Sequence, residues 1–406
     1  MQYKSIRGNK NMNNKPRYIE GTVRQKIVNL MHVCSVITPR SYKLLDEPQS
    51  SINNTMCKMK KEGVVEKGHN KEVFENFVIS NYKDNLNEYF IDNIPDENIE
   101  FFEQYGIQDI KRAKYSKDHI QTNSKRIIRS GEIVILMYSA GIPTLPADKK
   151  NIVKNKALTD NVYYQSREIK KYSGYTDDVE NITGERTAIA SRMNGTLLTA
   201  GGNYNIYHFG KDIQTWSTQG EFKIKHYIQN MLANYINQDS CILDSAILFT
   251  YDLNIFGKMI DPPKKYKDRC DGLCMTYDNL YVLPYDEDGR DMVKVMSESD
   301  WKVRLYEYAM EEPYKDTSKL DYVCDYYDGN VYTFIFCVPD ISRYIQFVRK
   351  VKFTDLPKEK FQVICFDYQK EFVISTIGKH ANIMSGDFQD FMDEWNQIRN
   401  RKQDAG

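Results

Sequence analysis

The residue types that contact nucleic acids recur at helical spacing over residues 51–62. Asn54 and Lys58 are four residues apart, and Lys61 follows three residues later, so their side chains share one face of a helix. Amide and ammonium groups reach base edges and phosphates from the major groove of DNA. We therefore predict that this helix reads DNA with Ser51, Asn53, Asn54, Thr55, Lys58, Lys60 and Lys61.

A second arrangement with chemical potential is the acid-x-lysine step of Glu221 and Lys223, which follows Asp212. An Asp and a Glu can hold a divalent metal ion while a lysine polarises the attacking water, as in metal-dependent nucleases. Residues 221–236 have the apolar spacing of a helix, whereas the nuclease arrangement requires a strand at this point. We therefore interpret Glu221 as the charged start of a surface helix and predict no catalytic residue.

Cysteine and histidine spacing does not indicate a metal site. Cys270 and Cys274 would supply two ligands, but a closed zinc site needs four, and no second Cys or His pair follows nearby. The 8 cysteines are scattered, which favours free thiols in a reducing cytosol over a disulfide framework. The sequence also lacks a GxxxxGK[ST] phosphate loop. We predict neither a metal nor a cofactor.

Two further helices must position the DNA-reading helix, and each has a start signal. Thr22 is placed to cap the first helix. Thr38 and Pro39 combine a capping hydroxyl with proline at the first helical position of the second. Ser50 or Ser51 would cap the third. The inward side chains of the third helix are Ile52, Met56 and Met59, and Gly63 ends it.

A β-hairpin is predicted directly after the third helix. Strands over 64–67 and 72–77 flank residues 68–71, a turn suited to a wing tip. Three helices followed by a hairpin are the winged helix-turn-helix arrangement, which we assign to residues 21–82. Contacts to the DNA backbone are then expected from Arg24, Arg40, Lys43, Lys67, His69 and Lys71.

Charge is sorted along the chain. The whole chain is neutral, with 56 basic and 56 acidic residues. Residues 1–71 hold fourteen basic and five acidic residues, a net charge of +9, which leaves −9 for residues 72–406. Such asymmetry favours contact with a polyanion at the basic end. Residues 1–20 are predicted to be a disordered basic arm that either lies along phosphates or only adds solubility.

The rest of the chain predicts an α+β protein with several domains. Residues 83–130 have the pattern of a helical connector, and within them Pro95 interrupts two amphipathic stretches. Strands and helices alternate over residues 131–385, which predicts a mixed α/β domain with a partly parallel sheet. Residues 386–406 form a charged helical tail. No apolar stretch is long enough to cross a bilayer, so we expect a cytoplasmic protein.

Three features within the α/β region bear on its interior. The run Ile133–Met137 suits either a buried strand or a core helix. Residues 195–209 predict a hairpin around Gly201, Gly202 and Asn203. Residues 143–188 are polar and predict a long irregular or partly helical insertion.

A family resemblance rests on three of these segments. The basic arm, VRQKIVNLMHVCSVITPRSYKLL over 23–45 and SSINNTMCKMKKEGVV over 50–65, followed by the wing, resemble the replication-relaxation family. Its members are winged-helix proteins of plasmids and integrative elements in Gram-positive bacteria, and often continue into a region that looks like a degenerate nuclease fold. This sequence has the strand, tryptophan and glutamate of that region in a similar order, in Ser191–Gly195, Tyr204–Tyr207, Trp216 and Glu221.

The resemblance implies a restriction-endonuclease-like fold for the α/β region and an accessory role in plasmid replication or conjugative transfer. The chain departs from the nuclease pattern at the metal-binding acids. The favoured hypothesis is a sequence-specific DNA-binding accessory protein whose partners are double-stranded DNA and a protein of the replication or transfer machinery. The alternatives are a metal-dependent nuclease or relaxase-like enzyme targeted by its winged helix, and a transcriptional regulator with a sensing C-terminal domain. Whether the chain forms a homodimer is open.

Overall fold

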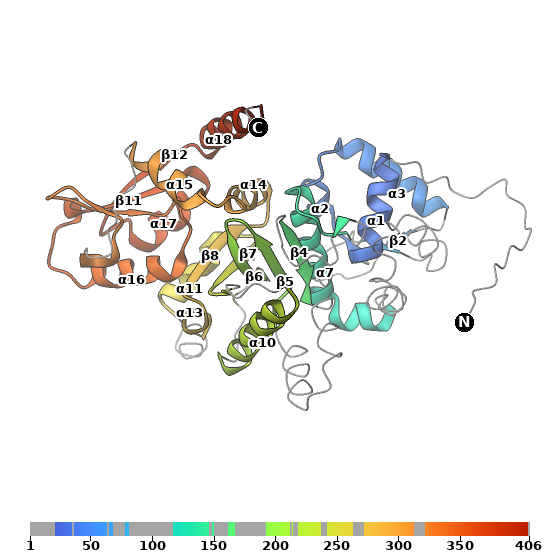
Figure 1. The fold of residues 1–406 in the computed structure, drawn as a ribbon, viewed down its shortest axis with the longest axis horizontal. Coiled ribbons are helices and arrows are strands. Elements are labelled where there is room, and N and C mark those ends of the chain that lie inside the picture. The colour runs from blue at the N-terminus through green and yellow to red at the C-terminus, as the bar shows by residue number, and fades with distance from the viewer. Residues whose placement is uncertain are drawn as a thin grey trace, which may run out of the picture.

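The computed structural model describes residues 21–34, 36–62, 65–67, 78–80, 117–145, 148–149, 161–166, 192–211, 213, 218–236, 242–262, 272–311 and 321–404. The expected arm, the wing tip with His69 and Lys71, the first part of the connector and Cys270 lie outside these residues. The described chain has an α+β fold with three sheets, of three, five and four strands. These sheets follow one another along the long axis of the molecule (Figure 1).

The first unit, which we call the head, combines three helices with the smallest sheet. Its elements are α1 (Val23–Cys34), β1 (Val36–Ile37), α2 (Pro39–Tyr42), α3 (Gln49–Lys61), β2 (Val65–Lys67) and β3 (Val78–Ser80). β3 lies in the middle and pairs antiparallel with both β1 and β2. The two-residue strand β1 is too short for its sequence to predict it, and the expected second strand at 72–77 lies outside the described residues.

The predicted starts of α1 and α2 are confirmed, whereas that of α3 is wrong. Thr22 Oγ1 accepts the Gln25 amide at 3.3 Å, and Thr38 Oγ1 accepts the Ser41 amide at 3.3 Å ahead of a proline at the first helical position. Neither Ser50 nor Ser51 caps α3, which begins one residue after Pro48. The Pro48 carbonyl accepts the amides of Ser51 and Ile52, and its fixed backbone angle sets the turn without a side-chain cap.

Helix α7 (Lys117–Ser139) runs through the boundary expected between connector and α/β region at 130. All five residues of Ile133–Met137 are buried, so the helical alternative for this run is confirmed. The run is apolar all round because α7 has neighbours on both sides. It contacts α1, β1 and α2 of the head, and β4 and β6 of the next sheet.

The central sheet contains β4 (Val162–Gln165), β5 (Gly195–Thr199), β6 (Gly202–Gly210), β7 (Ser245–Thr250) and β8 (Asn279–Pro284), in that spatial order. β4, β5 and β6 pair antiparallel, whereas β6, β7 and β8 are parallel. The hairpin around Gly201 and the partly parallel sheet are therefore confirmed. The expectation for residues 143–188 is wrong at β4, because its short buried strand is flanked by polar residues that hide its pattern.

Helices cover both faces of the central sheet, because alternate strand residues point to opposite sides. Leu197, Ile206 and Ile247 share a buried cluster with α7. Leu198, Tyr207 and Leu248 share another with α10 (Thr218–Ile236), which connects β6 to β7. The segment η4 (Leu253–Phe256), α11 (Gly257–Ile260) and α13 (Gly272–Thr276) connects β7 to β8.

A second mixed sheet follows after α14 (Glu287–Met296), α15 (Trp301–Met310) and η6 (Asp321–Val323). Its order is β12-β11-β10-β9, with β9 (Tyr326–Tyr327) antiparallel to β10 (Tyr332–Ile335), and with β11 (Phe361–Phe366) and β12 (Asn382–Gly386) parallel to it. The remaining elements are α16 (Ile341–Lys352), η7 (Lys358–Lys360), η8 (Asp367–Gln369), α17 (Lys370–Ile377) and α18 (Phe388–Asp404). The helix expected for the tail is confirmed as α18.

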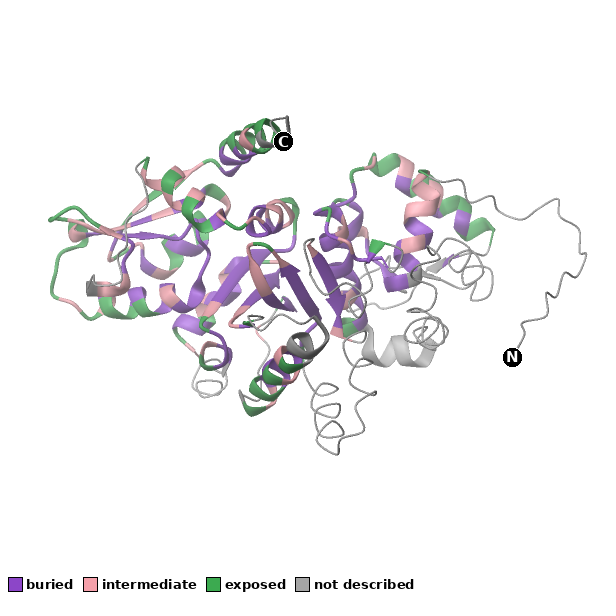
Figure 2. Ribbon diagram, in the orientation of Figure 1, coloured by how far each residue is buried: buried purple, intermediate pink, exposed green. Residues whose placement is uncertain are grey.

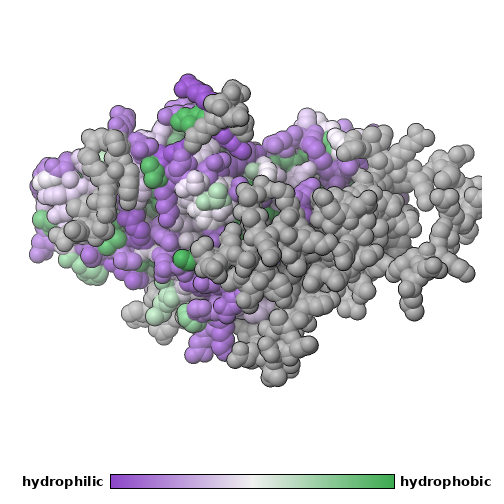
Figure 3. All heavy atoms as spheres, in the orientation of Figure 1, coloured by the Kyte–Doolittle hydropathy of each residue, from purple (hydrophilic) through white to green (hydrophobic). Residues whose placement is uncertain are grey.

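The interior is continuous from the head to the C-terminal helix. Ile27 and Met59 of the head belong to the same buried cluster as Ile133 of α7, Ile247 of the central sheet and Trp395 of α18. Figure 2 shows buried residues along the strands and α7, with exposed residues on the outer helices. In the view of Figure 3, apolar side chains appear on the C-terminal part only as separate spots among hydrophilic ones. No helix of the described chain is both long and apolar enough to cross a membrane.

Candidate nucleic-acid interface

Helix α3 has two faces of opposite character. Ile52 and Met59 are fully buried, and Met56 is nearly so. The opposite face exposes the side chains of Asn53, Asn54, Lys58, Lys60 and Lys61, with Ser51 and Thr55 half-buried at its border. Helix α1 contacts both α3 and α7, and α3 lies on the side of α1 away from the central sheet (Figure 1). The structure therefore brings the predicted base-contacting residues together on one open helix face.

Three acidic side chains of the head pair with basic side chains. Arg24 forms an ion pair with Glu62, and Lys26 Nζ lies 2.5 Å from Glu47. Arg290 of α14 lies 3.3 Å from Asp46. The hydrogen bond that Arg24 donates lowers the pKa of Glu62, and the hydrogen bond that Lys26 donates to Glu47 raises the pKa of Lys26. These pairs compensate the negative charge of Asp46, Glu47 and Glu62, which would otherwise oppose a polyanion at α3.

Among the described residues, four exposed lysines of the head form no ion pair of this kind, and Lys58 acts on Glu62 only through its charge at longer range. Within the part of the chain that the structure describes, no carboxylate lies within ion-pair distance of Lys43, Lys58, Lys60 or Lys61. Their charge is therefore available to phosphates, and its effect is largest at low salt.

The residues predicted to contact phosphates do not all lie with α3. Arg24 is half-buried in its pair with Glu62. The Arg40 guanidinium stacks on the Tyr251 ring, 3.6 Å from its centre, and is therefore at the junction between head and central sheet. Lys43 is exposed, Lys67 is the last residue of β2, and His69 and Lys71 lie outside the described residues.

A buried polar cluster fixes the head on the central sheet. Glu132 of α7 is 1% exposed, and its carboxylate accepts hydrogen bonds from His208 Nε2 at 2.9 Å, the Tyr251 hydroxyl at 2.6 Å and the Thr38 hydroxyl at 3.1 Å. Three donors compensate the loss of water around the buried carboxylate. Because Thr38 belongs to the head and the other two donors to the sheet, one carboxylate joins both.

Tyr285 makes a second connection in the same place. Its hydroxyl donates to the Glu132 carbonyl at 3.0 Å and lies 3.1 Å from the Ser41 hydroxyl of α2. Its ring stacks on His208 at 5.1 Å between centres. Burial raises the pKa of Tyr285, and the negative charge of Glu132 raises it further, so the hydroxyl stays protonated and donates.

Sequence reasoning missed this cluster although two signals were present. Glu132 is a lone acid in an apolar run, and His208 is a lone imidazole in the pattern of a buried strand. Tyr251 and Tyr285 are the first residues after β7 and β8, at the carboxyl ends of parallel strands, where polar groups of α/β sheets often meet. Only the fold brings the four together.

Glu221 belongs to a different buried network, on the α10 face of the sheet. It is 3% exposed, and its carboxylate accepts the Tyr207 hydroxyl at 2.7 Å. Tyr207 in turn lies 2.9 Å from the Tyr277 hydroxyl, which accepts Asn205 Nδ2 at 2.7 Å. The predicted helix at this point is confirmed, but its placement of Glu221 on the surface is wrong, because Tyr207 provides the buried carboxylate with a donor.

Lys223 is exposed on α10 and does not share the surroundings of Glu221. The apolar spacing of residues 221–236 would place Phe222 on the inner side of the helix, but this side chain is 49% exposed. Groups of three or more acidic, histidine or cysteine side chains that could hold a metal ion are absent from the described residues.

Comparisons with family models, with curated proteins and with solved structures give no match to the chain.

Proposed function

We propose that the head is a winged helix that binds double-stranded DNA through α3, in a sequence-specific accessory protein for plasmid replication or conjugative transfer. The observation that carries this proposal is the outer face of α3, where exposed amides and lysines lie opposite a buried apolar face. A helix of this kind reads base edges from the major groove with amides, while lysines neutralise phosphates.

The order of the head elements supports the same proposal. A helix, a short strand, two helices and two further strands, with the last strand in the middle of the sheet, is the arrangement expected of a winged helix. The turn between β2 and β3 would then be the wing, and Lys67 stands at its start. Phosphate contacts are assigned to Lys43, Lys58, Lys60 and Lys61, whereas Arg40 holds the head against Tyr251.

The central sheet is proposed to be a restriction-endonuclease-like core that serves as a scaffold. Helix α7, the antiparallel strands β4 to β6, the crossover helix α10 and the parallel strand β7 follow in the order expected of that fold. This order is also the observation that favours the second candidate function, a metal-dependent nuclease targeted by the head. The two candidates differ in what happens to bound DNA in the presence of Mg²⁺.

The test begins with selection of bound sequences from a random duplex library, followed by fluorescence anisotropy of the enriched duplex. The wild type is expected to enrich a defined sequence. Asn54→Ala should weaken binding to that duplex by about 10–100-fold and relax the enriched sequence, because a base contact is lost. Lys58→Ala should weaken binding to all duplexes and reduce the salt dependence by about one counterion.

The matched control is Lys358→Ala, which removes an exposed lysine from η7 in the C-terminal unit. It should leave affinity and salt dependence unchanged. Unchanged affinity in both Asn54→Ala and Lys58→Ala would refute the DNA-reading role of α3. Intact DNA after incubation with Mg²⁺ supports the accessory function, whereas nicked or cut duplex supports the nuclease.

A further inference from the structure

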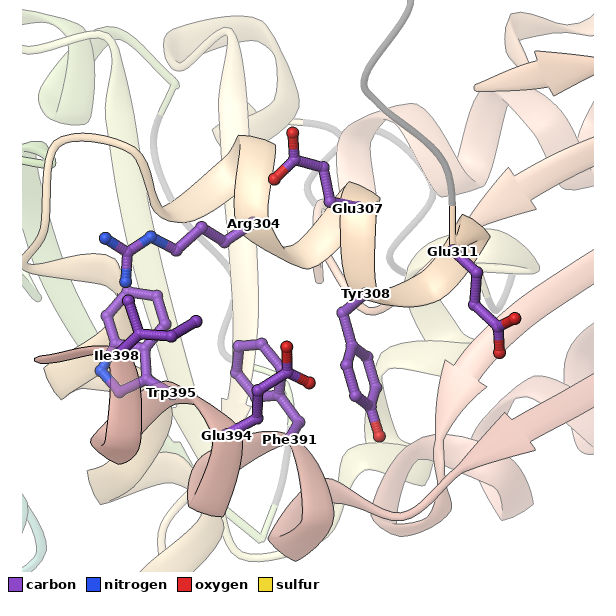
Figure 4. Close-up of a pocket in the computed structure, with 8 residues that line it drawn as sticks. All are labelled: Arg304, Glu307, Tyr308, Glu311, Phe391, Glu394, Trp395 and Ile398. Carbon is purple, nitrogen blue, oxygen red and sulfur yellow. The ribbon is translucent and has the colours of Figure 1, made fainter. Parts of the chain in front are cut away.

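A pocket of about 360 Å³ lies between α15 and α18, in the unit farthest along the chain from the head (Figure 4). Its base is aromatic. Phe391 and Trp395 of α18 are buried with ring centres 5.9 Å apart, and the Tyr308 ring of α15 meets the Phe391 edge at 5.0 Å. Of these three rings, Tyr308 is half-buried and lines the pocket most openly. An aromatic face attracts cations through the negative charge above the ring.

Acidic side chains surround this aromatic base. Glu307 comes from α15, Glu311 directly follows that helix, and Glu394 comes from α18. All three are exposed around the pocket in Figure 4. Among the described residues, none of these three carboxylates has a basic side chain within ion-pair distance. Burial raises the pKa of Tyr308, and the negative charges of Asp390 and Glu394 raise it further. The electrostatic environment of the pocket therefore favours a positive charge.

The chain already shows how a guanidinium is held at one end of this pocket. Arg304 lies over the Trp395 ring at 4.6 Å and is neutralised by Asp300, with 2.7 Å between Nη2 and the carboxylate. Stacking on an aromatic face combined with a carboxylate is the arrangement that suits arginine. The other end, around Tyr308, offers a ring and carboxylates of the same kind, and within the described residues no basic side chain pairs with these carboxylates.

We infer that the pocket between α15 and α18 binds an arginine side chain presented by a basic segment of a partner protein. Its guanidinium would stack against the half-buried Tyr308 ring and form charge-assisted hydrogen bonds with the surrounding carboxylates. Phosphates are excluded because three carboxylates repel them. The place of this binding in the function rests on the recruiting role proposed above, but the binding itself is tested without DNA.

The test uses a short glycine-arginine-glycine peptide and the matched peptide with neutral citrulline in place of arginine. The chain has three tryptophans, so ¹⁵N-labelled indole groups give three signals, and Trp395→Phe assigns the one in the pocket. The arginine peptide should shift the Trp395 signal, and the citrulline peptide should bind at least about tenfold more weakly. Glu394→Gln should weaken arginine binding about fivefold, and Glu307→Gln with Glu394→Gln more than about tenfold.

The matched control is Glu359→Gln. Glu359 is an exposed glutamate of η7, just before the start of β11, and does not line the pocket. It should bind the arginine peptide like the wild type. Equal binding of the two peptides, or unchanged binding in the double variant, would overturn the inference. The full chain is also tested for self-association through the basic residues of 1–20. If it self-associates, and both Glu394→Gln and removal of residues 1–20 abolish this, the pocket binds a second copy of the chain and the inference of a different partner protein is overturned.

Failure here is separable from failure of the proposed function. Glu394→Gln should bind the selected duplex with unchanged affinity, and Lys58→Ala should bind the arginine peptide with unchanged affinity. Loss of peptide binding with intact DNA binding therefore concerns only the pocket.

Discussion

Replacing Glu132 by alanine tests whether one buried carboxylate holds the head on the central sheet. The substitution removes the acceptor of hydrogen bonds from His208, Tyr251 and Thr38. Thr38 keeps a partner, since its hydroxyl lies 2.9 Å from that of Ser41. His208 and Tyr251 each lose a bond of the charge-assisted kind, worth about 1.5–3 kcal/mol. We therefore expect the free energy of unfolding to fall by about 3–5 kcal/mol, the usual cost of breaking a buried pair.

Urea unfolding followed by far-UV circular dichroism and tyrosine fluorescence measures this loss. Glu307→Ala is the matched control, because Glu307 is an exposed helical glutamate without an ion pair in the described structure, and it should stay within about 0.5 kcal/mol of the wild type. A double-mutant cycle with Thr38→Val should give a coupling free energy of about 0.5–3 kcal/mol between α7 and the head. A loss below about 1 kcal/mol in Glu132→Ala, or no coupling to Thr38, would refute the argument that this carboxylate joins head and sheet.

Three further predictions concern stability and DNA binding. Burial raises the pKa of Asp340 to about 6, so the folded state holds its proton more tightly than the unfolded chain. The contribution of Asp340 to the free energy of unfolding should therefore be present below about pH 4 and decline by about 3 kcal/mol as the pH rises through about 6. Asp340→Asn keeps the helix cap and should lack this decline in urea titrations at different pH values. Gly289→Ala should lower the unfolding midpoint, since a Cβ there would lie 1.8 Å from the Pro284 carbonyl oxygen, whereas Gly257→Ala meets nothing within 4 Å and should be neutral or stabilise by about 0.4–1 kcal/mol. Lys60→Ala should reduce the slope of log affinity against log salt by about one in anisotropy titrations, and an unchanged slope would exclude a phosphate contact.

Local signals predicted the parts of the fold that local chemistry controls. The starts of α1 and α2 followed from Thr22 and Thr38, because an N-cap needs only a hydroxyl and the amides of the next turn. The hairpin around Gly201 followed from glycines in a two-strand pattern. The inner face of α3 followed from the spacing of Ile52, Met56 and Met59 alone.

Features that depend on distant segments were not predictable in the same way. The buried run in α7 suited helix and strand equally, and its neighbours on both sides decided the outcome. The start of α3 was misplaced because two serines match a cap motif, whereas the backbone of Pro48 controls the turn. Arg40 was predicted to contact phosphate, but its guanidinium stacks on Tyr251, which is more than two hundred positions away in the sequence. Glu132 and His208 meet across 76 positions, a separation that no local pattern records.

Under the proposed function, the interior shared by α1, α7 and the central sheet bears on how DNA specificity can change. A head that buried its own core separately would be a module, transferable between proteins by recombination at its borders. Here Ile27 and Ile133 belong to one apolar interior, and Thr38 and Ser41 are bonded to residues far downstream. Excision near residue 82 would uncover that interior on both fragments. New specificity would therefore arise by point substitution on the outer face of α3, where Asn53 and Asn54 change without disturbing what lies beneath.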